Sequence, residues 1–301
     1  MQVEQKIDPV ANNLWHVISA LEEVKANIIH KTQLLGKPVS FSKTDTGIPC
    51  VWHTNPTDVA GDAVDLTSIN THLAVQYRYG YIWTSLGNPT EDVFQIPEYA
   101  ENDRRNIHAA TIGVHVSAPR AIENFLDMGH FPYVHTNILG IEPHTEVKEY
   151  DVNISVDETE ILATRCLFYQ PMASAASDGG SDVEYVYRVP HPYCSVLYKS
   201  SALDENRMDV IALFVQPLDQ ERVRAHMMLS LLDVDNTDIS IRAFQQTIFG
   251  QDKPILENQF PKRLPLDPRM ETPIRADKSA IAYRRWLSKK GLTYGVIPVA
   301  A

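Results

Sequence analysis

Runs of alternating hydrophobic and polar residues fill the centre of this chain, and such alternation is typical of antiparallel strands. Between residues 145 and 232, six of these runs are separated by turn signals such as DGGSD and PLDQ. Residues 73–83 are rich in aromatic and β-branched residues and predict one further strand. Residues 14–43 contain two β-like runs around a polar loop, whereas residues 47–72 are rich in turn formers and weakly patterned. The pattern predicts a protein built on an antiparallel sheet.

Three segments carry helical signals instead. Pro119 suits the first turn of a helix that continues into residues 123–135. Residues 238–259 predict a long helix that contains a proline. Residues 276–290 predict a last helix, which ends at Gly291, a common residue just beyond a helix C-terminus.

These elements divide the chain into two predicted domains. Residues 88–105 have the composition of a connector, and a predicted strand follows at residues 106–118. We therefore predict one domain over residues 1–105 and a second over residues 106–301. In the second domain, helices gather on a long antiparallel sheet, which is the layout of an α+β fold.

The overall composition is that of a globular protein with an excess of acidic residues. Of 301 residues, 44% are hydrophobic and 22% are charged, and the formal net charge is −11. Nucleic acids and anionic membranes are bound by clustered lysine and arginine, so this balance argues against both as partners. It is compatible with an enzyme for a small, uncharged or weakly charged molecule.

Cys50, Cys166 and Cys194 are the only cysteines, and such a small, odd-numbered set indicates a reducing compartment without a disulfide framework. Residues 1–13 have no apolar signal core, and no run of roughly 18 apolar residues occurs. We therefore expect a cytoplasmic protein that does not span a membrane.

The segment ENFLDMGHFPYVH, residues 123–135, gathers metal-capable side chains among apolar ones. Iron(II) that binds oxygen is commonly held by two imidazoles and one carboxylate on one face. His130 and His135 could be the imidazoles, although residues five apart on an ideal helix lie about 140° and about 7.5 Å apart. Pro132 cannot continue the helical hydrogen bonding, so a kink or break there could bring His135 back toward His130.

The carboxylate must come from elsewhere, and Asp252 is a candidate. It lies within the predicted long helix, in an apolar stretch, two residues before a proline. Aspartate is a poor residue for a helix interior, so its position needs a reason. Each signal alone also has an ordinary explanation as a surface or hydrogen-bonded core residue. Glu123 likewise could belong to the site or be a charge on the helix surface.

Together these residues form a pattern that resembles a known family. The spacing E-N-x-x-D-x-x-H-x-x-x-x-H in residues 123–135 resembles the mononuclear iron motif of the Rieske non-heme iron oxygenases. DKPILENQ, residues 252–259, resembles the segment that carries their third ligand. Residues 15–39, 79–83 and 276–287 resemble the start and end of the family's Rieske domain and its C-terminal helix, so the resemblance covers most of the chain.

The resemblance implies that His130, His135 and Asp252 bind one mononuclear Fe(II), with Asn124 as a further partner around the ligands. It also implies a catalytic domain of the helix-grip type, similar to START and Bet v 1 proteins, in which an antiparallel sheet wraps around a long helix. Residues 1–105 would then be a small, mostly β remnant of a Rieske domain.

The sequence departs from the family pattern at the iron–sulfur cluster. A Rieske 2Fe–2S cluster needs two cysteines and two histidines, arranged as C-x-H and later C-x-x-H. This chain has no C-x-H and a single C-x-x-H, formed by Cys50 and His53. We therefore expect no 2Fe–2S cluster in this chain and interpret Cys50 and His53 as structural or incidental.

Asp127 bears on the source of electrons. In the family, the matching aspartate links a ligand histidine to a cluster histidine of a neighbouring subunit. Asp127 lies three residues before His130, and its presence without a cluster predicts that another polypeptide supplies one. The alternative is a carboxylate that only orients His130.

Within the family, the sequence resembles the methylxanthine N-demethylases of bacterial caffeine breakdown, and the missing cluster points to 7-methylxanthine as the substrate. The resemblance implies oxidation of an N-methyl group by O2 and two electrons from NADH, with xanthine and formaldehyde as products. It also implies two protein partners: a reductase that carries flavin and an extra Rieske domain, and a structural subunit similar to glutathione S-transferases.

Two other functions stay open from the residues alone: an inactive oxygenase-like scaffold, and a carrier of hydrophobic small ligands. A complete set of predicted metal ligands argues against both.

For the substrate, Gln245, Ile248 and Phe249 share the predicted helix face of Asp252. The two apolar side chains could wall a flat ring, and the Gln245 amide could hydrogen-bond a purine edge, or all three could be ordinary core residues.

Overall fold

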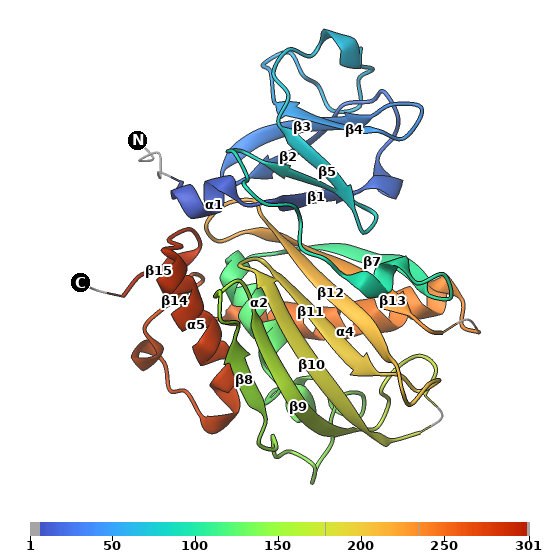
Figure 1. Ribbon diagram of the computed structural model, residues 1–301, viewed down its shortest axis with the longest axis vertical. Helices are drawn as coiled ribbons and strands as arrows, with labels where there is room; N and C mark the ends of the chain where they lie inside the picture. The colour runs from blue at the N-terminus through green and yellow to red at the C-terminus, as the bar shows by residue number, and fades with distance from the viewer. Residues whose placement is uncertain (1–6, 178, 234, 300–301) are drawn as a thin grey trace.

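The computed structural model describes residues 7–177, 179–233 and 235–299, and its main element is a seven-stranded antiparallel sheet (Figure 1). The strand order is β7-β13-β12-β11-β10-β9-β8. Consecutive strands pair from β8 to β13, so all six predicted runs form the expected meander, and β7 pairs with β13. The strands are β7 Arg105–Val114, β8 Asp151–Ile154, β9 Ile161–Gln170, β10 Ser181–His191, β11 Cys194–Ser200, β12 Met208–Pro217 and β13 Val223–Leu231.

Helices pack against this sheet as the helix-grip prediction requires. The long helix α4 (Asp238–Asn258) passes behind the strands in Figure 1, with α2 (Ala118–Leu126) beside it. The last helix, α5 (Lys278–Lys290), lies against β8 at one edge of the sheet and ends at Gly291, whose φ is 73°. The α+β fold class, with a sheet wrapped around a long helix, is therefore confirmed. Among the described residues, no helix is long and apolar enough to cross a membrane.

The residues before β7 form two smaller antiparallel sheets, which lie above the large sheet in Figure 1. One has the order β1-β6-β5 and the other β2-β3-β4. These strands are β1 His16–Ala20, β2 His30–Leu34, β3 Lys37–Lys43, β4 Pro49–His53, β5 Ala74–Arg78 and β6 Tyr81–Ser85. The other short α-helices and strands are α1 Pro9–Asn13, α3 Phe131–Val134 and the parallel pair β14 Leu264–Pro265 and β15 Val296–Ile297. Short 3-10 helices are η1 Leu21–Glu23, η2 Leu66–Ser68, η3 Pro97–Ala100, η4 Pro268–Met270 and η5 Arg275–Asp277. The large sheet starts at the predicted boundary, because β7 begins at Arg105. The division of the chain into two domains stays a prediction.

Two strand predictions in this part of the chain were wrong, and one strand was not predicted. Residues 73–83 contain a hairpin instead of one strand, because Tyr79 and Gly80 have φ of 57° and 82°, the conformation of a tight two-residue turn. Residues 14–43 hold three strands where two were expected. The weakly patterned residues 47–72 include β4, which exists because it pairs with β3.

A buried ionic network fixes α2 to α5. Glu123 accepts hydrogen bonds from Arg284 Nε at 2.6 Å and from Arg120 Nη1 at 3.1 Å, and Glu271 accepts from both arginines as well. Glu123 is only 8% exposed, so it is not a surface charge, and it is not one of the three side chains of the metal-capable group. The reading of Glu123 as a charge on the helix surface was wrong because it ignored α5, whose arginine meets Glu123 across a large sequence separation. Its place in the site stays a prediction.

The strand β12 is buried on both faces and joins the two parts of the structure. Leu213 and Val215 belong to the large core beneath the helices. Ala212 and Phe214 point the opposite way, into a cluster that includes Trp83 of β6. The rings of Phe214 and Trp83 are 4.9 Å apart.

We expect Phe214→Ala to lower the free energy of unfolding by about 3–5 kcal/mol, because truncating a fully buried ring leaves a cavity. Phe260→Ala is the matched control, since Phe260 is 79% exposed and its loss should cost below about 1 kcal/mol. Urea unfolding followed by circular dichroism measures both. Equal losses in the two variants would contradict the role given to β12.

Candidate metal centre

The chain breaks its helix just before the first candidate histidine. Helix α2 ends at Leu126, and α3 begins at Phe131. Between them, the Asp127 carboxylate accepts the backbone N–H of Gly129 at 2.8 Å, a local bond that competes with continued helix. Pro132 lies in the first turn of α3, where its missing N–H has no helical partner to lose.

The expected helix break therefore occurs, but not at Pro132 as predicted. The break was predicted to bring His135 back toward His130, and the two Nε2 atoms are indeed 3.1 Å apart. The turn at residues 127–130, rather than the proline, reverses the chain enough to bring the two imidazoles together.

Asp252, on α4, completes a triangle of polar atoms. Its Oδ1 lies 3.2 Å from both His130 Nε2 and His135 Nε2. Ligand atoms 90° apart and about 2.1 Å from one ion would be about 3.0 Å apart, so the triangle has the size of one face of an octahedral site. In the part of the chain that the structure describes, this is the one cluster of three or more such side chains that could hold a metal.

The donor set also fits a metal by its hydrogen bonding. Asp252 Oδ1 is buried and has no well-oriented hydrogen-bond donor among the described residues, although both imidazoles are near. A buried carboxylate oxygen without a donor is costly unless it binds a cation. Two imidazole nitrogens and one such oxygen on one face form the 2-His-1-carboxylate arrangement of non-heme Fe(II) sites.

The other nitrogen of each imidazole is fixed by a second polar group. His130 Nδ1 lies 3.1 Å from Asp127 Oδ2, and His135 Nδ1 lies 2.8 Å from Gln251 Oε1. Because these partners are acceptors, each Nδ1 donates its N–H to them, which leaves Nε2 as the nitrogen of each ring that would bind a cation in the triangle. The contact of Asp127 with His130 was expected from the sequence, whereas Gln251 was missed, and its only signal was its place directly before Asp252.

Charge within the cluster shifts the titration of two members. Burial alone would lower the pKa of His130, but hydrogen bonds with Asp127 and Asp252 outweigh it and raise the pKa to about 9. Burial would raise the pKa of Asp252, but the two nearby imidazoles of His130 and His135 favour the carboxylate and lower the pKa to about 2. Asp252 is therefore a carboxylate at neutral pH, as a metal ligand must be.

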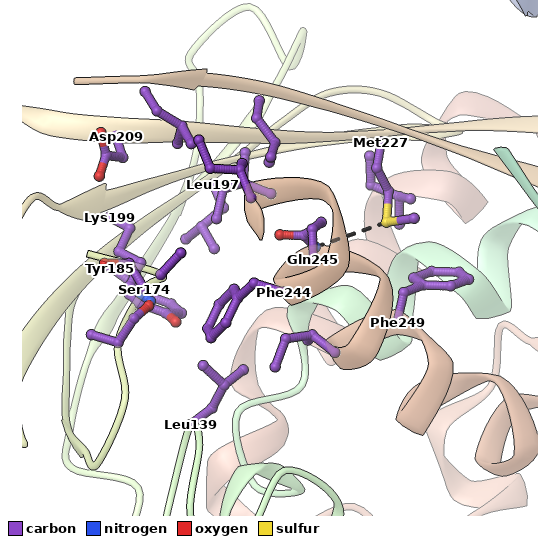
Figure 2. Close-up of a pocket in the computed structure, with 18 of the residues that line it drawn as sticks. Leu139, Ser174, Tyr185, Leu197, Lys199, Asp209, Met227, Phe244, Gln245 and Phe249 are labelled. Atoms are coloured by element: carbon purple, nitrogen blue, oxygen red, sulfur yellow. Dashed lines mark hydrogen bonds between the residues drawn. The ribbon is translucent and has the colours of Figure 1, made fainter. Parts of the chain in front are cut away.

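The triangle lies in the wall of an apolar cavity between the sheet and α4. The predicted pocket residues Gln245, Ile248 and Phe249 all line it. Figure 2 shows Gln245 within this cavity, its amide 3.8 Å from the sulfur of Met227 on the sheet. Phe244 also lines the cavity and was not predicted. The helix face predicted from Asp252 is thus the face that meets the cavity.

A second depression lies on the other side of His130. This surface groove is lined by Asn124, Asp127 and His130 together with residues of the segment before α5. The Asp127 side chain is 36% exposed, and Asn124 lines both the groove and the apolar cavity. His130 is therefore reached from the inner cavity and from the outer surface.

Cys50 and His53 lie on β4, away from this cluster. Cys50 Sγ is 3.7 Å from His72 Nδ1, while His53 is exposed. Within the described residues no third ligand joins them in a metal-capable group. Their interpretation as structural or incidental stays a prediction.

Comparisons with known proteins agree with this geometry. Residues 114–292 match the family described as "Vanillate O-demethylase oxygenase C-terminal domain". The chain is 45% identical to the probable methylxanthine N7-demethylase NdmC of Pseudomonas sp. (strain TJI-51), over 93% of this chain and 95% of that protein. It is 27% identical to the methylxanthine N1-demethylase NdmA of Pseudomonas putida, over 70% of this chain and 58% of that protein.

Solved structures of low sequence identity share the fold. The structure of Pseudomonas putida CBB5 NdmA with caffeine superposes with a TM-score of 0.74 at 18% identity, covering 93% of this chain and 92% of that one. Dicamba monooxygenase bound to dicamba gives a TM-score of 0.69 at 14% identity, covering 93% and 97%. Both carry the same sheet and helix arrangement.

The chain belongs to the Rieske non-heme iron oxygenases, in the branch with a vanillate O-demethylase-type C-terminal domain. Its named sequence relatives are methylxanthine N-demethylases, and it is a homologue of their oxygenase components. The predicted family is thereby confirmed.

Gln251→Leu should weaken Fe(II) binding by roughly 10- to 100-fold, because His135 loses the acceptor that orients its ring. Gln246→Leu is the matched control on the same helix, since the Gln246 amide donates to the Ala109 carbonyl and not to the cluster. Titration of metal-free protein with Fe(II) under nitrogen measures both affinities. Equal affinities would remove Gln251 from the site.

Proposed function

We propose that this chain is the oxygenase component that removes the N7-methyl group of 7-methylxanthine, giving xanthine and formaldehyde. The observation that carries the proposal is the 3.1–3.2 Å triangle of His130, His135 and Asp252 in the wall of an apolar cavity. The identity of 45% to a protein named as a probable methylxanthine N7-demethylase supports the choice of methyl group.

In this proposal His130, His135 and Asp252 hold one Fe(II), and the cavity holds the purine with its N7-methyl group facing the triangle. Bound iron would supply O2 activation: one oxygen atom enters the methyl C–H bond, the other leaves as water with two electrons and two protons, and the N-hydroxymethyl product breaks down to formaldehyde. Ile248 and Phe249 exclude water and contact the flat ring, while Gln245 offers both a donor and an acceptor to its edge.

We further propose that electrons reach the site through Asp127. Its carboxylate joins His130 to the surface groove, where a protonated histidine of a partner's Rieske cluster could form a charged hydrogen bond with it. The partner is an NADH-dependent reductase that carries flavin and a Rieske cluster, since this chain lacks the C-x-H half of a cluster motif. A structural subunit similar to glutathione S-transferases is proposed from the family resemblance.

Purified protein should contain about one iron per chain and no acid-labile sulfide, and with the reductase it should release formaldehyde from 7-methylxanthine. Alanine at His130, His135 or Asp252 should remove both iron and turnover, because two ligands hold the ion too weakly. Metal analysis and formaldehyde detection provide the readouts. Iron-free wild-type protein, or a fully iron-loaded alanine variant, would contradict the ligand assignment and favour a carrier or scaffold.

Asp127→Asn should keep iron within about 20% of wild type but lower NADH-driven turnover by at least about 100-fold, because the amide lacks the negative charge that stabilises a protonated cluster histidine. Asp277→Asn is a control in the same groove that does not contact His130. A turnover rate near wild type in Asp127→Asn would rule out the relay, leaving Asp127 only as a group that orients His130.

A further inference from the structure

A lysine lies in the wall of the apolar cavity, and none of the roles assigned above accounts for it. Lys199, on β11, is only 5% exposed and lines the same cavity as the metal-capable triangle. Burying an ammonium group is costly unless partners compensate it, so such a lysine in an otherwise apolar wall calls for a reason.

Within the part of the chain that the structure describes, Lys199 uses only a part of its hydrogen-bonding capacity. Among the described residues, its ammonium donates one hydrogen bond, to the Ala173 carbonyl, and lies 5.4 Å from the centre of the Tyr185 ring. An ammonium group has three N–H donors, so two have no partner among the described residues and could meet a molecule in the cavity. Burial lowers the pKa of Lys199 to about 7, although the negative charge of Asp209 opposes the shift. A further acceptor would stabilise the charged form.

Lys199 and the metal-capable triangle line the same cavity at different positions. Figure 2 shows Lys199 and Tyr185 on one side of Gln245 and Phe249 on the other, and Phe249 is one helical turn before Asp252. The Phe131 ring, next to His130, is 6.0 Å from the Tyr185 ring, which in turn lies beside Lys199. One bicyclic ring could therefore reach from the triangle toward the ammonium.

The chemistry of the proposed substrate decides what this ammonium meets. In 7-methylxanthine, the C6 carbonyl is adjacent to N7, whereas the C2 carbonyl lies on the far side of the six-membered ring. With the N7-methyl group at the triangle, the C2 oxygen is directed away from the triangle. That oxygen is a hydrogen-bond acceptor, and Lys199 is a buried donor in the cavity wall.

We propose that Lys199 determines specificity by donating a charged hydrogen bond to the C2 carbonyl oxygen of the bound dioxopurine, an inference that rests on the proposed function. A purine without this oxygen would leave the buried ammonium unpaired, and sites of that kind discriminate sharply. Asp209, buried nearby, supplies the balancing negative charge in the wall of the same cavity.

Binding can be tested without turnover or a reductase. Isothermal titration of Fe(II)-loaded protein under nitrogen would compare 7-methylxanthine with 7-methylhypoxanthine, which lacks the C2 oxygen. Wild type should bind 7-methylxanthine at least about 10-fold more tightly, the effect of one charged hydrogen bond. Lys199→Met should lose about 10- to 100-fold of the affinity for 7-methylxanthine and should bind the two purines equally within about 3-fold.

Two further variants separate recognition from packing. Lys199→Gln keeps a neutral donor on a side chain one bond shorter and should show part of the wild-type preference for 7-methylxanthine. Leu197→Met changes an apolar cavity residue on the same face of β11 and should leave the preference unchanged. Neither variant alters a proposed metal ligand, so iron content should stay at the wild-type level in all of them.

The outcomes distinguish this inference from the proposed function. If wild type binds 7-methylxanthine and Lys199→Met keeps the wild-type ratio of the two affinities, Lys199 only hydrogen-bonds the Ala173 carbonyl. The inference about Lys199 then fails, and the proposed function stands. Equal binding of the two purines by wild type also overturns it, even if the variants do not fold. If iron-loaded wild type binds neither purine, the proposed function fails together with the inference.

Discussion

Three polar atoms from distant parts of the chain are held 3.1–3.2 Å apart in a largely buried site, and the arrangement around them follows from that constraint. Two imidazoles and a carboxylate at this spacing are shielded from water, so each needs hydrogen-bond partners from the protein or a bound cation to offset the lost hydration. The outer nitrogens meet this need through Asp127 and Gln251, and the inner atoms are left to face one another. Asp252 keeps its place because α4 is packed against the large sheet, while Glu123 ties α2 to α5 just before the histidine segment.

His130 lies between two openings through which other molecules could approach it. One side of the residue meets the apolar cavity under the sheet, and the other meets a groove on the surface. A purine-sized substrate and an electron-carrying protein differ greatly in size, and the cavity and the groove offer each of them a separate approach to His130. Under the proposed function, electrons from another polypeptide would approach His130 from the groove while substrate occupies the cavity.

The sequence predicted the elements whose pattern is local. Alternation gave the strands β8 to β13, and the proline and glycine signals gave the start of α2 and the end of α5. It did not predict β4, whose Val51 and Trp52 are buried only through contacts with other strands, or the hairpin turn at Tyr79 and Gly80. Both depend on tertiary pairing or on φ angles that residue type alone does not specify.

The same limit applies to the site. A short histidine motif and one aspartate within a helix were enough to predict the three candidate ligands. Helical periodicity then placed Gln245 and Phe249 on the face that lines the cavity. Lys199 carried no signal, because an alternating strand does not reveal that its polar member points inward under a curved sheet. Glu123 was misread because its partner Arg284 lies on a separate helix near the C-terminus.

The most direct test of the central claim is anomalous diffraction at the iron absorption edge from crystals of iron-loaded protein. The account predicts a single anomalous peak per chain, about 2.1 Å from His130 Nε2, His135 Nε2 and an oxygen of Asp252. A peak at Cys50 and His72 instead, or an iron-loaded crystal with no peak inside the triangle, would contradict it.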